Sequence, residues 1–149
     1  MNDLIAFATA HGLTVKGTPT IHEFELIGAS NGRTITMAQG SILHPRGGGK
    51  LFHFRLTFEP FACEPSWMLT PQGATKWAAH SPSPCAPEDV PGFATFGPAL
   101  TEFGAEVKTH WQLKRGEMNR LYLEALELVT PRAWALAWAV LDAVSRAHE

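Results

Sequence analysis

The sequence predicts an α+β fold, in which an N-terminal antiparallel sheet of three or four strands packs against two long C-terminal helices, with a short N-terminal helix. Two patterns carry this prediction. Apolar and polar residues alternate over residues 51–59, as in a strand with one buried face. Apolar residues then recur at helical spacing from residue 98 to residue 129, as in a long amphipathic helix.

The composition predicts one globular domain over residues 1–149. The chain has 149 residues, of which 45% are hydrophobic, and this is enough to form a core without disulfides or metals. We expect a helix and sheet in residues 1–60, a proline-rich loop in 81–98 and a helical pair in 98–149. A net charge of −2 gives no overall attraction to nucleic acid, so such binding would need a local basic patch.

The N-terminal elements follow from turn residues and from strand composition. Residues 3–11 predict a short helix that ends at a glycine. Residues 20–27 have the composition of a strand, and Asn31-Gly32 is a strong hairpin signal that leads into a returning strand over 33–38. A shorter strand is expected at 41–44.

The strand over residues 51–59 has the strictest pattern in the chain. Its apolar face consists of Phe52, Phe54, Leu56 and Phe58. These side chains need a covering layer, whereas the polar face fits an antiparallel sheet that is open to solvent on one side.

The middle of the chain is rich in proline. Residues 70–81 predict a helix of one or two turns, with Thr70 as its N-cap and Pro71 at its first position. Residues 81–98 contain five prolines and no periodicity, so we expect a surface loop. Its apolar residues should hold it against the body; they are Val90, Phe93 and Phe96.

The C-terminal third predicts a long helix followed by a second helix. An apolar sector about 120° wide, at 100° per residue, is formed by Leu100, Phe103, Val107, Trp111, Met118, Leu121, Tyr122, Ala125, Leu128 and Val129. Whether this is one helix or two, broken near Gly116, is left open. Thr130 and Pro131 then suit the N-cap and first position of a helix that runs to the end.

The predicted helices offer more apolar surface than a small sheet can cover. We therefore expect an interface with a protein partner, or between two copies in a homodimer, centred on Trp111, Trp134, Trp138 and Leu141.

A basic hairpin is the second candidate binding site. Its members are His44, Arg46, Lys50, His53 and Arg55. The glycine run before Lys50 does not make a phosphate-binding P-loop, because a strand follows it instead of Ser or Thr and a helix. A flexible basic tip suits an acidic protein surface or a nucleic-acid backbone.

Catalytic and metal-binding patterns are weak. The chain lacks closely spaced histidine pairs, and we predict no catalytic residue, no metal ligand and no cofactor. Two alternatives stay open. The polar face of residues 51–59 could be an acid/base cluster or a set of cross-strand ion pairs, and Cys63, His80 and Cys85 could ligate zinc, although their spacing is nonspecific.

The sequence favours a non-enzymatic interaction protein, such as an adaptor, regulator or inhibitor of another macromolecule. One alternative is a nucleic-acid-binding accessory protein that uses residues 44–55. Another is a small enzyme or ligand-binding domain with a pocket between sheet and helices. Two cysteines, no signal-peptide pattern and no run of about 18 apolar residues indicate a cytoplasmic protein without membrane contact.

Overall fold

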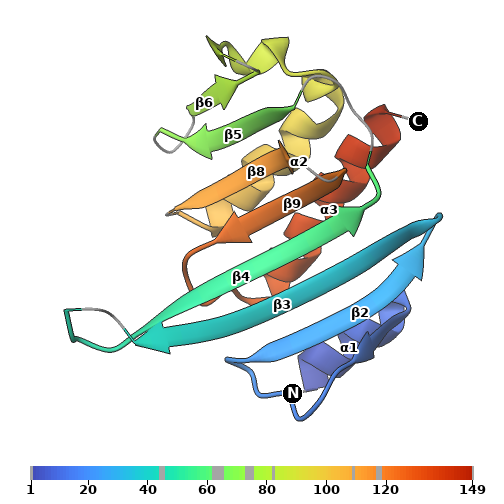
Figure 1. Cartoon of the computed structure of the whole chain (residues 1–149), viewed down its shortest axis with the longest axis vertical. Helices are drawn as coiled ribbons and strands as arrows, with labels where there is room; N and C mark the ends of the chain where they lie inside the picture. Colours follow the sequence, from blue (N-terminus) through green and yellow to red (C-terminus); the bar gives the residue numbers. More distant parts are fainter. Residues whose placement is uncertain are drawn as a thin grey trace.

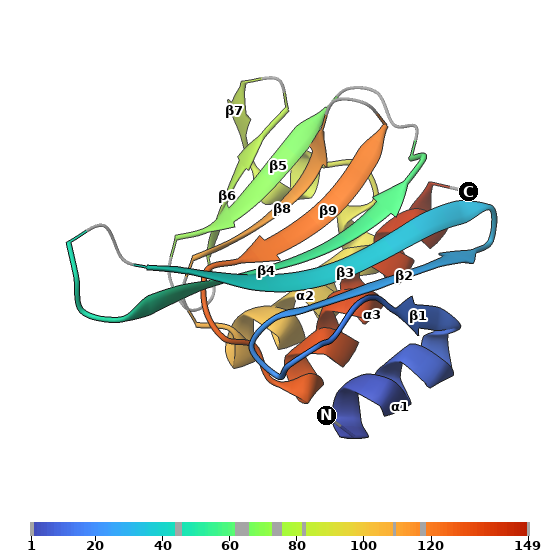
Figure 2. The ribbon, with the colours of Figure 1, turned by 60° about the horizontal axis from the view of Figure 1, so that its bottom comes forward.

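In the part of the chain that the structure describes, a nine-stranded antiparallel sheet carries three α-helices on one of its faces (Figures 1 and 2). The computed structural model describes residues 2–43, 46–61, 66–72, 76–81, 83–108, 110–116 and 119–148. The helices are α1 (Asn2–His11), the short 3-10 helix η1 (Pro87–Asp89), α2 (Phe93–Glu106) and α3 (Pro131–Ala147). The strands are β1 (Leu13–Val15), β2 (Phe24–Ser30), β3 (Arg33–Leu43), β4 (Lys50–Glu59), β5 (Trp67–Pro71), β6 (Trp77–His80), β7 (Pro84–Cys85), β8 (Trp111–Gly116) and β9 (Arg120–Ala125).

The order of strands in the sheet is β1-β2-β3-β4-β9-β8-β5-β6-β7. The chain therefore passes from β4 to β5 and leaves room for two strands, which the hairpin β8–β9 later fills. Both of these late strands lie in the middle of the sheet, because β9 pairs with β4 and β8 pairs with β5.

The α+β class and the antiparallel sheet are confirmed, but the predicted arrangement is wrong. The sheet has nine strands instead of three or four, and the long helix expected over residues 98–129 does not exist. Only its first part is helical, in α2; residues 111–125 contain β8 and β9. The helical sector omitted Leu113 and Leu123, which are completely buried. With them included, the apolar residues alternate with period two, as strands require.

A second predicted helix, over residues 70–81, is also wrong. This segment belongs to the hairpin β5–β6, in which Pro71 pairs with Trp77. Proline at the end of a strand costs no ladder hydrogen bond, so the supposed helix start is a strand end. The proline-rich segment becomes helical at Phe93, earlier than expected, although Val90 and Phe96 are buried as predicted.

The N-terminal predictions hold better. The first helix ends at His11, and Asn31 and Gly32 have positive φ angles of 52° and 76°, which suit a two-residue hairpin turn. The two short strands expected after this turn are one long strand, β3. In β4 the predicted apolar face is the core face, because Phe54, Leu56 and Phe58 are buried.

The core lies between the sheet and the helices. Thr130 caps α3 as predicted, since its hydroxyl accepts a hydrogen bond from the Ala133 N–H at 3.1 Å. On α3, Trp134 and Leu141 are completely buried. On α2, Phe96 stacks on Trp67 with ring centroids 5.7 Å apart. The apolar side of α3 is thus covered within the chain, and the expected surplus of apolar helical surface does not arise in the described residues.

None of the described helices combines the length and the apolar character that a membrane crossing requires.

Candidate functional site

One face of the sheet carries no helix among the described residues, and this open face points toward the viewer in Figure 1. The register places one row of side chains across it from β2 to β8, through Glu25, Ala38, Arg55, Glu124 and Gln112. Side chains on this face are mostly polar and partly exposed, whereas those between them on the same strands are buried against the helices.

The hairpin of β3 and β4 projects beyond the rest of the sheet (Figures 1 and 2). Pairing between β2 and β3 stops at Gln39, and pairing between β4 and β9 stops at Phe54. Beyond these residues the two strands pair only with each other, from Gly40↔His53 to Leu43↔Lys50. We call residues 40–53 the arm.

Exposed apolar side chains gather at the arm. Among the described residues, six large hydrophobic side chains are exposed, and only Ile5 of α1 lies away from this region. Leu43 and Leu51 belong to the arm, with 78% and 39% of their surfaces exposed. Leu126 follows the residue that pairs with Phe54 at the base of the arm. The remaining two are Ile21 and Leu128. We call Ile21, Leu43, Leu51, Leu126 and Leu128 the arm patch.

Gln39 explains why Ile21 and Leu128 lie at the base of the arm. Its buried side-chain amide donates hydrogen bonds to the carbonyl oxygens of Ile21 and His22, each at 3.2 Å. Its side-chain oxygen accepts a hydrogen bond from the Val129 N–H at 3.5 Å. One glutamine therefore ties two segments that are distant in sequence to β3, where the arm begins.

The five basic residues predicted as a binding site are not equivalent. His44 lies outside the described residues, whereas Arg46 and Lys50 are exposed on the arm. At its base, His53 and Arg55 contact the carboxylate of Glu124, at 3.4 Å and 2.5 Å. Among the ion pairs of the described residues, His53 and Arg55 therefore share one carboxylate, whereas Lys50 has none.

Glu124 is the residue that sequence reasoning missed in the polar cluster. Its side chain is 13% exposed, and it also accepts a hydrogen bond from Gln112 at 3.5 Å. Arg55 additionally lies over the ring of Tyr122, at 5.6 Å. These contacts make the cluster a set of cross-strand ion pairs. The alternation of apolar residues with other residues over 121–125 was the sequence signal that could have placed Glu124 on the open face.

The predicted interface residues on the helices lie in or against the core. Trp111, Trp134 and Leu141 are buried, and Trp138 is half-buried between Phe58 and His11, with ring centroids at 5.3 Å and 4.0 Å. Contacts within the chain account for these residues without a partner.

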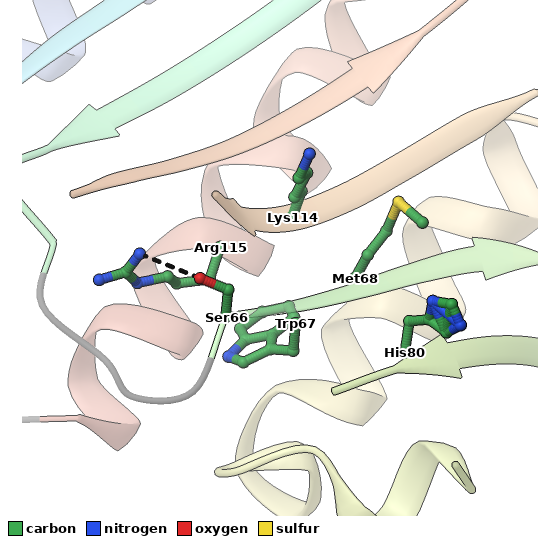
Figure 3. Close-up of a pocket in the computed structure, with 6 residues that line it drawn as sticks. All are labelled: Ser66, Trp67, Met68, His80, Lys114 and Arg115. Atoms are coloured by element: carbon green, nitrogen blue, oxygen red, sulfur yellow. Dashed lines mark hydrogen bonds between the residues drawn. The ribbon is translucent and has the colours of Figure 1, made fainter. Parts of the chain in front are cut away.

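A pocket of 490 Å³ lies near the end of the open face where β5 begins and β8 ends (Figure 3). Its lining consists of Ser66, Trp67, Met68, His80, Lys114 and Arg115. Two neighbouring hollows of 310 Å³ and 320 Å³ share Met68 with it. The three hollows form a trough across β8, β5 and β6. Between the sheet and α3, where a ligand pocket was one expectation, there is a hollow of only 40 Å³ beside Asp142 and Ser145.

The zinc alternative is not supported within the described part of the chain. Cys63 lies outside it. His80 pairs with Pro84 and Cys85 with Ala79, so the His80 and Cys85 side chains point to opposite faces of the sheet. No group of three or more His, Cys, Asp or Glu side chains among the described residues is arranged to hold a metal ion.

Comparisons of the chain with protein-family models, with curated protein sequences and with solved structures find no match.

Proposed function

We propose that this chain is a non-enzymatic interaction protein that binds a protein partner through its arm. The observation that carries the proposal is the arm patch, which contains five of the six exposed large hydrophobic side chains among the described residues. Apolar side chains concentrated in one exposed region are typical of protein interfaces. A two-stranded hairpin without neighbours is also only marginally stable in water, so a partner would supply the missing contacts.

The arm favours a groove over a flat surface as its binding site on the partner. Residues opposite each other in a strand pair share a face, so Leu51 lies on one face of the arm. Leu43 and Lys50 lie on the other face. A partner that buries both leucines must therefore enclose the arm from two sides.

The charge of the arm favours an acidic partner. Residues 40–53 contain Arg46 and Lys50 but no aspartate or glutamate. Lys50 is exposed beside Leu43, so the rim of the partner's groove should carry carboxylates. Such pairs at a rim contribute mainly to association rate and to specificity.

The same features support a protein partner over nucleic acid. Single-strand binding without sequence preference uses exposed aromatic rings on which bases stack. In the described residues of the arm the one phenylalanine, tyrosine or tryptophan ring is that of Phe52, which is half-buried and lies 5.3 Å from the ring of His22. Exposed leucines contribute little to contacts with phosphates, but they bury well in a protein groove.

The test is binding by the double variant Leu43→Ser plus Leu51→Ser. Partners are first captured by the full-length wild-type chain from its native host, and the affinity of the purified partner is then measured by calorimetry. We expect the double variant to lose at least tenfold in affinity, because two apolar side chains no longer leave water. The matched control is Ile5→Ser, which changes an exposed apolar residue outside the arm patch and should leave the affinity unchanged.

Two outcomes would contradict the proposal. Equal binding by the double variant and the Ile5→Ser control would exclude the arm as the interface. Binding of labelled RNA or DNA that falls steeply with salt, and that is lost in Arg46→Ala plus Lys50→Ala but retained in the leucine variant, would identify the chain as a nucleic-acid-binding protein.

A further inference from the structure

Arg115 is a buried cation without an acidic partner among the described residues. Only 5% of its surface is exposed, at the end of β8. Its guanidinium group donates hydrogen bonds to neutral oxygen atoms: the hydroxyl of Ser66 at 3.5 Å, the side-chain oxygen of Asn119 at 3.2 Å and the carbonyl of Gly116. In the described part of the chain, no carboxylate lies within ion-pair distance of it.

Two buried donors in this region have no acceptor among the described residues. One is the Nε–H of Arg115, and the other is the indole Nε1–H of Trp67. A buried donor without a partner destabilises the folded chain, and an uncompensated buried charge destabilises it more. Both residues line the pocket of 490 Å³, and Figure 3 shows Arg115 extending toward Ser66 at the end opposite His80.

Further positive charge lies along the same pocket. Lys114, Met68 and His80 face each other in one row across β8, β5 and β6 on the open face. The described lining thus contains one arginine, one lysine and one histidine, and no carboxylate.

We propose that this pocket binds a small molecule through an anionic group, a phosphate or a carboxylate. Arg115 supplies a fixed charge from the side of the sheet that carries the helices, and Ser66 supplies a hydroxyl beside it. Lys114, the preceding residue of β8, points to the open face and supplies a second charge at the other side of the pocket. Arginine suits planar or multidentate anions, and its interactions are strongest where water is excluded. The bound anion would provide the counter-charge that Arg115 lacks among the described residues.

The shape of the pocket indicates an elongated ligand with an apolar part. A volume of 490 Å³ falls within the usual range for small-molecule sites, and the neighbouring hollows extend it past Met68. Methionine is flexible and apolar, so it suits contact with a hydrocarbon or a ring attached to the anionic group. The pocket of 490 Å³ is separate from the arm, which projects from the opposite end of the sheet in Figure 1, although the hollow of 310 Å³ reaches Leu126 of the arm patch.

The test measures binding of inorganic phosphate, pyrophosphate and succinate to the full-length chain, each against sodium chloride at equal ionic strength. We expect either the phosphate anions or succinate to raise the melting temperature of the chain, with an effect that saturates as the anion concentration increases. A ligand that binds only the folded chain stabilises it in this way. A preference for phosphate and pyrophosphate over succinate identifies a phosphate ligand, and the reverse identifies a carboxylate. In nitrogen-15 NMR spectra, the indole N–H resonance of Trp67 should shift when the anion binds. The variant Trp67→Phe identifies this resonance, because the resonance is missing from its spectrum.

Variants then locate the site. We expect Lys114→Gln and Ser66→Ala to weaken binding three- to tenfold, and Arg115→Gln to abolish it. Lys76→Gln removes an exposed lysine that does not line the pocket, so it should bind like the wild type. The lysine and serine variants keep the test decisive if the arginine variant does not fold.

The proposal is overturned if no anion gives a saturable effect beyond that of salt, or if Lys114→Gln and Lys76→Gln behave alike. It is also overturned if Glu64→Gln or Glu117→Gln destabilises the chain as much as Arg115→Gln does, without any anion effect. That result would show that one of these carboxylates, which lie outside the described residues, already neutralises Arg115.

Discussion

At the scale of single residues, His11 shows how one side chain links folding to pH. Its ring lies between Phe7 of α1 and Trp138 of α3, with centroid distances of 4.4 Å and 4.0 Å. Burial lowers the pKa of His11 below its usual 6.5, although the negative charge of Asp142 acts in the opposite direction. The neutral imidazole is therefore the form that joins α1 to α3 in the folded chain.

This pKa shift predicts that acid weakens the attachment of α1. The unfolded chain binds a proton at His11 more readily than the folded chain does, so stability is complete above pH 6.5. It declines as the pH falls below 6.5 and stops declining once the folded form is also protonated. Urea unfolding at pH 7.5 and pH 5.5 measures the difference in the free energy of unfolding.

The matched variant is His11→Phe, which keeps an aromatic ring between Phe7 and Trp138 but cannot be protonated. Its loss of stability between the two pH values should be smaller than that of the wild type. An equal loss in both chains would show that other groups cause the pH dependence. Circular dichroism at each pH checks that α1 is intact at the start of the titration.

At the scale of elements, local signals predicted those parts whose residues interact with near neighbours. The Asn31-Gly32 turn, the alternation in β4 and the cap of α3 by Thr130 each depend on a few adjacent residues, and each is confirmed. The helix prediction failed over residues 111–125 because a helical sector and two short strands would each place many of the same apolar residues on one side. Leu113 and Leu123 distinguish the two patterns, and both belong to the core.

The candidate sites were only partly predictable for a related reason. The basic residues of the arm are close in sequence, so they could be identified together. Glu124 contacts His53 across 71 positions, and Arg115 contacts Ser66 across 49 positions. Contacts of this kind depend on the order of strands in the sheet, which residue patterns within single elements do not contain.

The alternation in β9 predicts a contrast between two leucines that lie three residues apart. Leu123 is completely buried, whereas Leu126 is 53% exposed. We expect Leu123→Ala to lower the free energy of unfolding by about 2–5 kcal/mol, because it leaves a cavity. Leu126→Ala should change it by no more than about 0.5 kcal/mol. Chemical denaturation of both variants measures this contrast, and similar losses would disprove the register of β9.

At the scale of the whole molecule, the two true edges of the sheet are short. The edge strand β1 has three residues, and β7 has two, the first of which is a proline. Short edge strands and prolines prevent unwanted pairing with other chains. The arm instead presents two free edges, from Gly40 to Leu43 and from Lys50 to His53. This difference supports the arm as the place where the molecule accepts a partner.

The same architecture predicts the order in which backbone amides exchange with solvent. Residues 55–58 of β4 have neighbouring strands on both sides, and the side chains of Leu56 and Phe58 lie in the core, so their amides should exchange only when the whole chain unfolds. Residues 41–43 and 50–52 have one neighbour each, and opening the arm exposes no core residue. Their amides should therefore exchange at least a hundredfold faster. Hydrogen exchange followed by NMR measures both rates in one sample. Equal protection in the arm and in the centre of β4 would mean that the arm is already covered, for instance by a second copy of the chain; dilution would then raise the exchange rate of the arm alone.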